Sequence, residues 1–298
     1  MREMSLILAT VGRTTELNRL FDSLIAQSFR DFEVIVVDQN QDDRLKYILQ
    51  RARSLGIVLK HRQHYPPNLA LARNAGIAAA SGKWLGFPDD DCWYEPQTLE
   101  RIMKRSRRND MPQGVICRWT EQDSEVPPGL LSWDRSCRFR DIPVSSITLF
   151  FQRDLVKQIG GFDGRLGIGQ WFGAAEETDI VLRALRAGAL LAYEPTAQVH
   201  HKPEPKITKG SEKTRRAARH RARGTGALYA KHGLPKWVIF RGLLAPVLRP
   251  VLKGRLGLEL AHGMAVARGR LDGWLRWSFK HARAQNHQAA QFYDSSTP

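Results

Sequence analysis

Largely apolar runs alternate with amphipathic stripes through the first two-thirds of the chain. Residues 5–10 and 33–37 are runs of the first kind, which are typical of strands buried on both faces of a parallel sheet. Between them, apolar side chains recur at positions 17, 20, 21, 24 and 25, the spacing of one helix face. This order predicts a strand–helix–strand unit, the building block of an α/β sheet.

The same alternation continues along the chain. The pattern predicts helices at 42–54 and 69–80, and strands at 57–61 and 84–87. A further strand is expected at 190–193. Together these elements predict an open α/β sheet, in which ligands bind beyond the carboxyl ends of the strands.

Polar residues gather where those strands end. Residues 10–13 follow the first strand, residues 38–40 the second, and the acidic triplet Asp89, Asp90 and Asp91 the fourth. Three adjacent carboxylates repel one another, and a divalent cation relieves that repulsion. Mg²⁺ and Mn²⁺ take oxygen ligands, commonly one or two carboxylates, waters and substrate phosphates. The triplet therefore indicates a metal-diphosphate site, although in isolation it also fits a solvated turn with a helix N-cap.

Charge is distributed unevenly along the chain. The 298 residues carry a net charge of +16, and residues 202–298 hold 20 Lys or Arg against five acids, so the first two-thirds are nearly neutral. This asymmetry predicts two regions with separate tasks. We expect chemistry in residues 1–205 and attraction to an anionic partner in residues 206–298.

The cysteines and the apolar runs bear on the compartment. Cys92, Cys117 and Cys137 form no C-x-x-C pair and show no zinc-like spacing, so neither a disulfide framework nor a structural zinc site is expected. The apolar stretch near the N-terminus is too short for a secretion signal. No run reaches the roughly 18 apolar residues of a membrane-spanning helix. We therefore expect a cytoplasmic protein, soluble or peripheral at the inner face of the cell membrane.

Six segments, in this order, resemble the motifs of the family 2 glycosyltransferases, whose catalytic domain has the GT-A fold. They are Ile7–Arg13, Val36–Asn40, Ala72–Gly76, Gly82–Asp91, Gly160–Asp163 and Ala175–Arg183. The resemblance covers roughly residues 4–205. It implies a GT-A type open, mostly parallel mixed sheet with flanking helices, followed here by a basic helical C-terminal extension. It also implies an inverting enzyme that uses a nucleotide-sugar.

The resemblance further implies which residues hold the nucleotide-sugar. Thr10, Arg13 and Asp38, with Asn40 beside them, correspond to positions that bind the nucleotide, and Arg73 corresponds to a position near the donor diphosphate. A guanidinium suits that role because its donors form a planar fork. Two plainer interpretations remain open: Asp38 and Asn40 form a turn, and Arg73 forms a surface salt bridge.

The acidic triplet aligns with the D-x-D motif of the family. By this resemblance Asp89 approaches the ribose or the metal, Asp90 belongs with the donor-binding residues, and Asp91 coordinates a Mn²⁺ or Mg²⁺ ion bridging both phosphates. His201 corresponds to a third metal ligand, and an imidazole suits Mn²⁺ better than Mg²⁺. A surface histidine without any such role is the alternative for His201.

An acidic pair opens the helix expected after residue 175. The resemblance implies that Glu177 is the general base, taking the proton from the acceptor hydroxyl as that oxygen attacks the anomeric carbon. Glu176 is the reserve candidate. The family more often has Asp at the position of Glu177, so this side chain reaches one methylene further. Both glutamates are also compatible with a simple interaction with the helix dipole.

The segment 164–173 precedes this helix and contains four glycines. Glycine-rich connections serve either as lids or as ordinary turn-rich loops, and the sequence does not choose between them. Trp171 within it is expected either to stack on a sugar or to pack in the core.

Two apolar stripes follow in the basic region, over residues 240–252 and 256–275. Cationic amphipathic helices that carry tryptophan are typical of an anionic membrane surface, whereas helices of a soluble protein ordinarily pack on their own domain. Both interpretations remain open. Pro246 and Pro250 are expected to kink or break the first helix. From about residue 284 the composition predicts a polar, disordered tail.

These observations favour an inverting, metal-dependent glycosyltransferase with a Mn²⁺ or Mg²⁺ cofactor. Its expected partners are a nucleotide-sugar donor, a glycan or lipid-linked acceptor of polysaccharide biosynthesis, and an anionic membrane surface. A nucleic-acid-binding protein is a different class that the basic region suggests, but it leaves the acidic motifs unused and is disfavoured. A metal-dependent nucleotidyltransferase is the third hypothesis, and it differs in releasing diphosphate.

Overall fold

The computed structural model describes residues 2–121, 126–139, 144–202 and 211–294, with side chains described as far as Phe279. Contacts divide the chain into two compact units. Unit 1 comprises residues 1–164 and 177–204, and unit 2 comprises residues 165–176 and 205–298.

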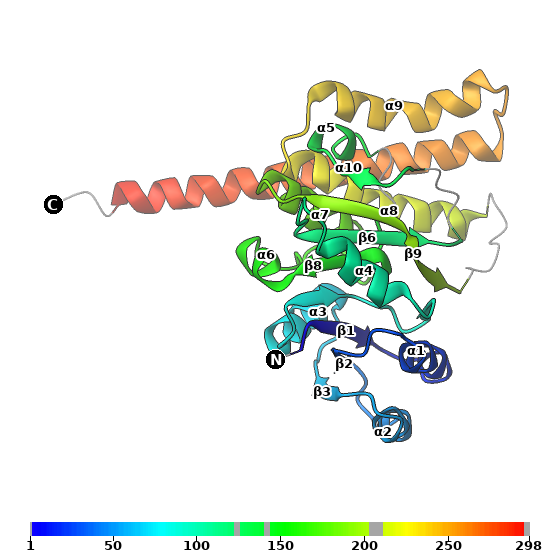
Figure 1. The fold of residues 1–298 in the computed structure, drawn as a ribbon. Coiled ribbons are helices and arrows are strands. Elements are labelled where there is room, and N and C mark those ends of the chain that lie inside the picture. Colours follow the sequence, from blue (N-terminus) through cyan, green and yellow to red (C-terminus); the bar gives the residue numbers. More distant parts are fainter. Residues whose placement is uncertain (1, 122–125, 140–143, 203–210, 295–298) are drawn as a thin grey trace. The chain divides into compact units, whose positions relative to one another are not determined.

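Unit 1 contains one mixed sheet, made of nine strands among the described residues (Figure 1). The strands are β1 (Met4–Thr10), β2 (Phe32–Asp38), β3 (Leu59–Gln63), β4 (Trp84–Gly86), β5 (Cys92–Tyr94), β6 (Gly114–Trp119), β7 (Gly129–Leu130), β8 (Leu149–Gln152) and β9 (Leu191–His201). Their order is β3-β2-β1-β4-β8-β6-β9-β5, with β7 paired to β9. The β3-β2-β1-β4 half is parallel, and β8 runs antiparallel to both β4 and β6. The predicted open, mixed α/β sheet is confirmed.

Helices cover both faces of this sheet, because successive residues of its central strands are apolar and point to opposite faces. On β1, Leu6 and Leu8 join the core cluster beneath α1, α2 and α4, whereas Ile7 joins the opposite cluster beneath α3, α6 and α7. Those helices, with the short α5 and a 3₁₀ turn, are α1 (Thr15–Ile25), α2 (Lys46–Ser54), α3 (Leu69–Ala79), α4 (Thr98–Ser106), α5 (Trp133–Ser136), η1 (Ser146–Thr148), α6 (Arg153–Gln158) and α7 (Glu176–Arg186). Burial on both faces explains the unbroken apolar runs of β1 and β2.

Several boundaries differ from the sequence-based expectation, and the strand expected at 57–61 lies at Leu59–Gln63. The second helix begins at Lys46 rather than at residue 42, and β4 ends at Gly86, two residues before Pro88. The last strand is much longer than residues 190–193, because β9 continues to His201. Its pairing with β6 shifts register between Cys117 and Arg118, and this irregularity accommodates Pro195 inside the strand. Because of this interruption, the pattern of apolar residues does not reveal the second half of the strand.

A buried carboxylate, Glu33 on β2, ties three segments of unit 1 together. Its Oε1 accepts hydrogen bonds from Ser5 Oγ (2.7 Å), Ser81 N (2.8 Å) and Ser81 Oγ (2.6 Å), and its Oε2 pairs with Lys60 Nζ (2.8 Å). Burial raises the pKa of Glu33, but the hydrogen bonds from Lys60, Ser81 and Ser5 outweigh it and lower this pKa from 4.5 to about 2.

Glu33→Gln is therefore expected to lower the free energy of unfolding at neutral pH, by about 1–3 kcal/mol for a buried hydrogen-bonded charge that loses its partners. Because the folded pKa lies below the unfolded one, the ionised Glu33 stabilises the fold above pH 4.5, and that contribution is lost as the pH falls towards about 2. Urea denaturation of both proteins between pH 7 and pH 3 measures it. A stability difference that does not shrink on acidification would contradict this assignment.

Unit 2 contains three long helices, α8 (Glu212–Lys231), α9 (Lys236–Leu252) and α10 (Leu258–Asp294), and α10 packs on both of the others (Figure 1). Glycines bring α8 and α10 close together. A Cβ added to Gly226 would lie 1.9 Å from the carbonyl oxygen of Arg270, and one added to Gly273 would lie 2.0 Å from that of Arg223. This close approach requires the absence of a side chain at both positions.

Pro246 and Pro250 were expected to kink or break the first helix, and they do not break it, because α9 is a single helix that includes both. A proline at 246 leaves the carbonyl of Gly242 without its helical N–H donor. Arg270 Nη1 of α10 donates to that carbonyl at 2.6 Å, so packing replaces the missing hydrogen bond. Helix α10 continues through residues 284–294, where the sequence suggested a tail. The Ala and Gln residues there are strong helix formers.

Candidate active site

The carboxyl ends of the parallel strands bring together the polar segments of the sequence. Thr10 and Asp38 are register partners at the ends of β1 and β2, and β4, on the other side of β1, leads into the acidic triplet. Thr10 Oγ1 donates to Asp90 Oδ2 at 2.7 Å. Residues far apart in the chain thus meet at one edge of the sheet, as parallel strand ends must.

Each carboxylate of the triplet has its own partners. Asp89 pairs with Arg73 Nη2 (3.0 Å) and accepts from Ser146 Oγ at 3.2 Å. Asp90 accepts from Thr10 and pairs with Arg13 Nη1 (2.6 Å). These pairs offset the negative charges of two adjacent carboxylates.

Asp91 forms the third set of pairs, with His201 Nε2 (2.9 Å) and with Arg13. Burial by itself raises the pKa of Asp91, but His201 and Arg13 outweigh it, so this pKa lies below its ordinary value. The same hydrogen bond raises the pKa of His201. Asp90 differs, because burial is the dominant influence and raises its pKa. The triplet therefore contains carboxylates of unequal acidity.

Asp38 is buried at the end of β2 and anchors a turn. Its Oδ1 accepts from Asn40 N (2.9 Å) and Asn40 Nδ2 (2.7 Å), and its Oδ2 lies 3.0 Å from His61 Nε2. Asn40 Oδ1 in turn accepts from the backbone N–H of Gly12 at 2.7 Å. This network fixes the loops after β1 and β2 to each other. Asp38 and Asn40 therefore do form a turn. Their carboxylate and amide groups lie at the edge of the sheet where the parallel strands end.

Arg73 of α3 joins the acidic triplet to the acidic pair. Its side chain is 1% exposed, with Nη2 3.0 Å from Asp89 Oδ1 and Nη1 3.7 Å from Glu177 Oε1. Helix α3 lies close on the sheet, since a Cβ added to Gly76 would lie 2.3 Å from Ile7 Cγ2. The alternative interpretation of Arg73 as a surface salt bridge is wrong, because this guanidinium is buried between two carboxylates from distant parts of the chain.

The structure distinguishes the two glutamates at the start of α7. Glu177 is partly exposed, with 21% of its side chain accessible, and its carboxylate faces Arg73. Glu176 is 2% exposed and packs against Gly167, whose added Cβ would lie 3.0–3.2 Å from the Glu176 carboxyl group. Only Glu177 combines solvent access with a contact to the residue that binds Asp89.

Among the described residues, no group of three or more His, Cys, Asp or Glu side chains is arranged to hold a metal ion. Asp91 and His201 do present a carboxylate oxygen and an imidazole nitrogen to each other at 2.9 Å, a donor pair that suits Mn²⁺. Two protein ligands fit a cation that is also held by substrate phosphates. Asp89 is engaged by Arg73 and Ser146 instead. The residues present therefore fit a divalent cation that Asp91 and His201 would hold.

Three contacts escaped the sequence analysis. His61 binds Asp38, Ser146 binds Asp89, and Asn74 holds Phe162 by donating to its O (2.8 Å) and accepting from its N (2.8 Å). Only Asn74 carried a signal, as the neighbour of Arg73 in a recognised segment. His61 and Ser146 lie in segments without a motif, so only the tertiary structure could identify them.

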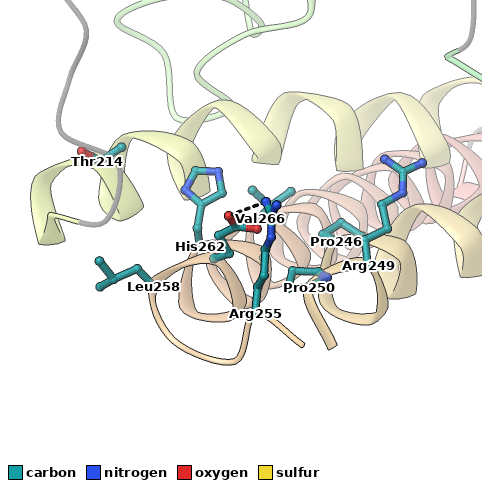
Figure 2. Close-up of a pocket in the computed structure, with 10 residues that line it drawn as sticks. Thr214, Pro246, Arg249, Pro250, Arg255, Leu258, His262 and Val266 are labelled. Atoms are coloured by element: carbon teal, nitrogen blue, oxygen red, sulfur yellow. Dashed lines mark hydrogen bonds and ion pairs between the residues drawn. The ribbon is translucent and has the colours of Figure 1, made fainter. Parts of the chain in front are cut away.

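A separate cavity of about 650 Å³ lies within unit 2, between α9 and α10 and near the start of α8 (Figure 2). Its lining includes Arg249, Arg255, His262 and Leu258, and Arg255 Nη1 pairs with Glu259 at 2.9 Å. None of the sequence-predicted site residues lines it. The strand-edge cluster, not this cavity, is the candidate active site. None of the helices in the described part of the chain is long and apolar enough to cross a membrane.

Comparison with known proteins gives a consistent result. The family model described as "Glycosyl transferase family 2" matches residues 5–160. A Campylobacter jejuni protein named GalNAc(5)-diNAcBac-PP-undecaprenol beta-1,3-glucosyltransferase is 30% identical over 108 residues, which are 36% of this chain and 35% of that protein. The chain spans about a third of the length of several curated relatives that it matches.

Solved structures are similar over nearly the whole chain. S. aureus TarS 1-349 in complex with UDP-GlcNAc matches with a TM-score of 0.59 and 16% identity, covering 89% of this chain and 90% of that one. The mannosyltransferase PcManGT from Pyrobaculum calidifontis, in complex with GDP-Man and Mn2+, matches with a TM-score of 0.61 and 17% identity, covering 97% and 80%. At these identities the likeness concerns the fold.

Proposed function

Since the chain belongs to glycosyl transferase family 2 and has the GT-A fold, we propose that it transfers a sugar from a nucleotide-sugar to an acceptor hydroxyl with inversion. The observation that carries this proposal is the buried Arg73, which contacts Asp89 of the acidic triplet and Glu177 of the acidic pair. The guanidinium of Arg73 thus contacts both the proposed donor-binding acid Asp89 and the proposed base Glu177. Inverting transfer needs both groups beside the same anomeric carbon.

The proposed donor site consists of the loops after β1, β2 and β4. Asp38 accepts a hydrogen bond from an N–H of the nucleotide base, with Asn40 beside it, while Thr10, Arg13, Asp89 and Asp90 line the ribose and diphosphate. Arg73 stabilises negative charge on the departing diphosphate. The complexes of TarS with UDP-GlcNAc and PcManGT with GDP-Man support a nucleotide-sugar as donor.

We propose Asp91 and His201 as the protein ligands of a divalent cation, Mn²⁺ or Mg²⁺, with Asp89 nearby. When bound, this cation neutralises charge that develops on the leaving nucleoside diphosphate. The Mn2+ in the PcManGT complex supports such a cofactor. Arg13 pairs with Asp90 and Asp91, and its guanidinium would be a further hydrogen-bond donor for a phosphate of the nucleotide-sugar.

Glu177 is the proposed general base. Its partly exposed carboxylate accepts the proton of the acceptor hydroxyl while that oxygen attacks the anomeric carbon. The pair with Arg73 orients this carboxylate. Glu176 is buried, which disfavours it for contact with an acceptor and leaves it a structural role at the start of α7.

A thermal-shift screen tests the donor assignment. We expect UDP, GDP, UDP-GlcNAc or GDP-mannose to raise the melting temperature, and to raise it more when Mn²⁺ is present. A ligand at a hundredfold excess over its Kd stabilises the fold by about 2.7 kcal/mol. Stabilisation by none of these compounds, with or without Mn²⁺, would argue against the proposal. Product analysis separates the alternative, because a nucleotidyltransferase releases diphosphate and a glycosyltransferase releases a nucleoside diphosphate.

The acceptor is proposed to be lipid-linked, supported by the name of the Campylobacter jejuni relative and by an exposed apolar face on α9. Six side chains of that helix, between 44% and 84% exposed, fall within an arc of about 120° at helical spacing. They are Trp237, Phe240, Leu244, Leu248, Val251 and Leu252. Arg241 falls within this arc, and Lys236 and Arg249 lie beyond its two edges. An apolar stripe with cationic borders complements an anionic phospholipid surface.

Binding of the full chain to vesicles tests this surface. Vesicles containing phosphatidylglycerol should bind the protein and vesicles of phosphatidylcholine alone should not, and Phe240→Asp with Leu244→Asp should weaken binding by about tenfold or more, since two apolar contacts are lost and two negative charges gained. Tyr47→Asp, at an exposed position of unit 1, is the matched control. Undiminished binding by the double variant would exclude α9, and salt-sensitive RNA or DNA binding without vesicle binding would favour the nucleic-acid hypothesis.

A further inference from the structure

Strand β9 ends in two histidines, His200 and His201, whose side chains have different partners. Successive residues of a strand point to opposite faces of the sheet. The ring of His200 stacks on that of Trp93, its register partner on β5, with centroids 5.2 Å apart and an interplanar angle of 4°. The ring of His201 faces Asp91 instead, with Nε2 2.9 Å from Oδ1. The end of β9 therefore carries a proposed metal ligand next to a histidine with another task.

A hydrogen bond to the backbone selects the ring nitrogen of His201 that faces Asp91. His201 Nδ1 lies 2.8 Å from the carbonyl oxygen of Lys202, and since a carbonyl only accepts, Nδ1 donates its proton there. Nε2 is then the nitrogen directed at Asp91. Histidines that bind metals ordinarily donate their other ring N–H to a carbonyl or carboxylate, which fixes the orientation of the ring. The imidazole of His201 is thus oriented for a cation as long as its backbone stays in place.

Backbone pairing between β6 and β9 stops short of His201. Strand β6 ends at Trp119, and Thr120 N donates to Val199 O at 3.0 Å. In a parallel ladder the N–H of residue 201 points to the same edge of β9 as the carbonyl of residue 199. The carboxylate of Glu121 accepts this N–H, with Oε2 3.1 Å from His201 N. A side chain thus continues the ladder by one step, to the residue that faces Asp91.

The carboxylate of Glu121 is itself held by His200. Glu121 Oε1 lies 3.0 Å from His200 Nδ1, and Glu95 Oε1 lies 2.7 Å from His200 Nε2. Stacked on Trp93 and placed between two carboxylates, the His200 ring orients Glu121 towards the backbone of His201. All of these residues belong to unit 1.

We propose that Glu121 is a positioning residue for the divalent cation, because it holds the backbone of His201 so that the imidazole stays opposite Asp91. One oxygen of Glu121 is engaged by His200 and the other by the His201 N–H, so Glu121 acts through His201. The inference rests on the proposed role of His201 as a metal ligand. Glu121 lies outside the six segments of the family resemblance, so the sequence carried no signal for it.

Three variants of the full chain test this role. Glu121→Ala removes the acceptor of the His201 N–H, whereas Glu121→Gln keeps an amide oxygen that can accept it. Glu3→Ala is the matched control, because the side chains of Glu3 and Glu121 are both 28% exposed and the change of charge is the same. Glu3 pairs with Lys83 and precedes β1, at the opposite end of that strand from the acidic triplet.

The first measurement is the Mn²⁺ concentration that gives half of the Mn²⁺-dependent rise in melting temperature, with UDP and with GDP. We expect Glu121→Ala to raise this concentration by about tenfold or more, the effect of losing a group that orients a metal ligand. Glu121→Gln should restore most of the affinity, and Glu3→Ala should leave it unchanged. A merely structural loss lowers the melting temperature without moving this concentration.

Two outcomes of that titration would overturn the inference and leave the proposed function standing. One is a wild-type Mn²⁺ dependence in Glu121→Ala. The other is equal weakening in Glu121→Ala and Glu121→Gln, since the hydrogen bond to the His201 N–H would then be irrelevant.

Hydrogen–deuterium exchange tests the contact without Mn²⁺ or nucleotide. Exchange of the His201 amide should accelerate in Glu121→Ala and stay unchanged in Glu3→Ala, because only the first variant loses the acceptor of that N–H. Unchanged exchange in Glu121→Ala would overturn the inference whatever the protein transfers. A wild-type protein that Mn²⁺ does not stabilise with either nucleotide would instead count against the proposed cation, even where accelerated exchange shows that Glu121 holds His201.

Discussion

Asp91→Ala is expected to abolish Mn²⁺-dependent release of the nucleoside diphosphate, with a fall in turnover of about 100-fold or more. The physical reason is that Asp91 is the carboxylate that faces His201 at 2.9 Å, so its removal leaves a single protein ligand for the proposed cation. Arg13 would still pair with Asp90, so the strand edge keeps part of its charge balance. Turnover against Mn²⁺ concentration measures the effect.

Asp42→Ala is the matched control for this substitution. Asp42 is an exposed carboxylate of the same region, paired with Arg44 at 2.6 Å, and its removal changes the net charge by the same amount. It should leave turnover and Mn²⁺ dependence unaltered. Asp91→Ala with turnover close to wild type would contradict the assignment of Asp91 as a ligand of the cation. Loss of turnover in both variants would point to a general charge effect.

Glu177→Gln is expected to lower kcat by about 10²–10⁴-fold, the range that a positioned general base contributes. Glutamine keeps the size of the side chain and its contact with Arg73, but it accepts no proton at neutral pH. Arg73 retains its pair with Asp89, so the donor site should persist. Donor affinity, measured by thermal shift or calorimetry, should therefore stay within a factor of a few of the wild type.

Glu176→Gln provides the comparison, because it makes the same chemical change one residue earlier at a buried side chain. We expect it to alter stability more than kcat. The opposite pattern, with kcat lost in Glu176→Gln and kept in Glu177→Gln, would reassign the base to Glu176. Wild-type kcat in both variants would remove the acidic pair from the mechanism.

Much of unit 1 was predictable because its elements leave local signals. The unbroken apolar runs of β1 and β2 reflect burial on both sheet faces, and the stripe on α1 reflects contact with one face. The acidic triplet was located correctly at the end of β4, since a strand must stop before three adjacent charges. Elements with broken patterns were missed in part, as β9 illustrates with Pro195 inside it.

The candidate site was likewise predictable only in part: its residues were, but the contacts between them were not. Sequence motifs nominated Asp89, Asp91, Arg73 and Glu177 one by one, with alternatives left open for each. Their mutual contacts could not be predicted, because Arg73 reaches Asp89 across 16 residues and Glu177 across about a hundred, separations that no periodicity records. His61 and Ser146 had no motif at all and became visible only through their hydrogen bonds.

What the sequence determined by itself is the α/β alternation, the edge of the sheet where the polar segments collect, and the family to which they belong. These follow from local periodicity and from the rule that parallel strands end at a common edge. The tertiary structure alone decided that one buried guanidinium joins two acidic motifs, that α9 runs through its prolines, and that Glu121 holds the backbone of His201. Such contacts depend on how side chains distant in the chain pack against one another in the folded interior. Local sequence patterns do not record that packing.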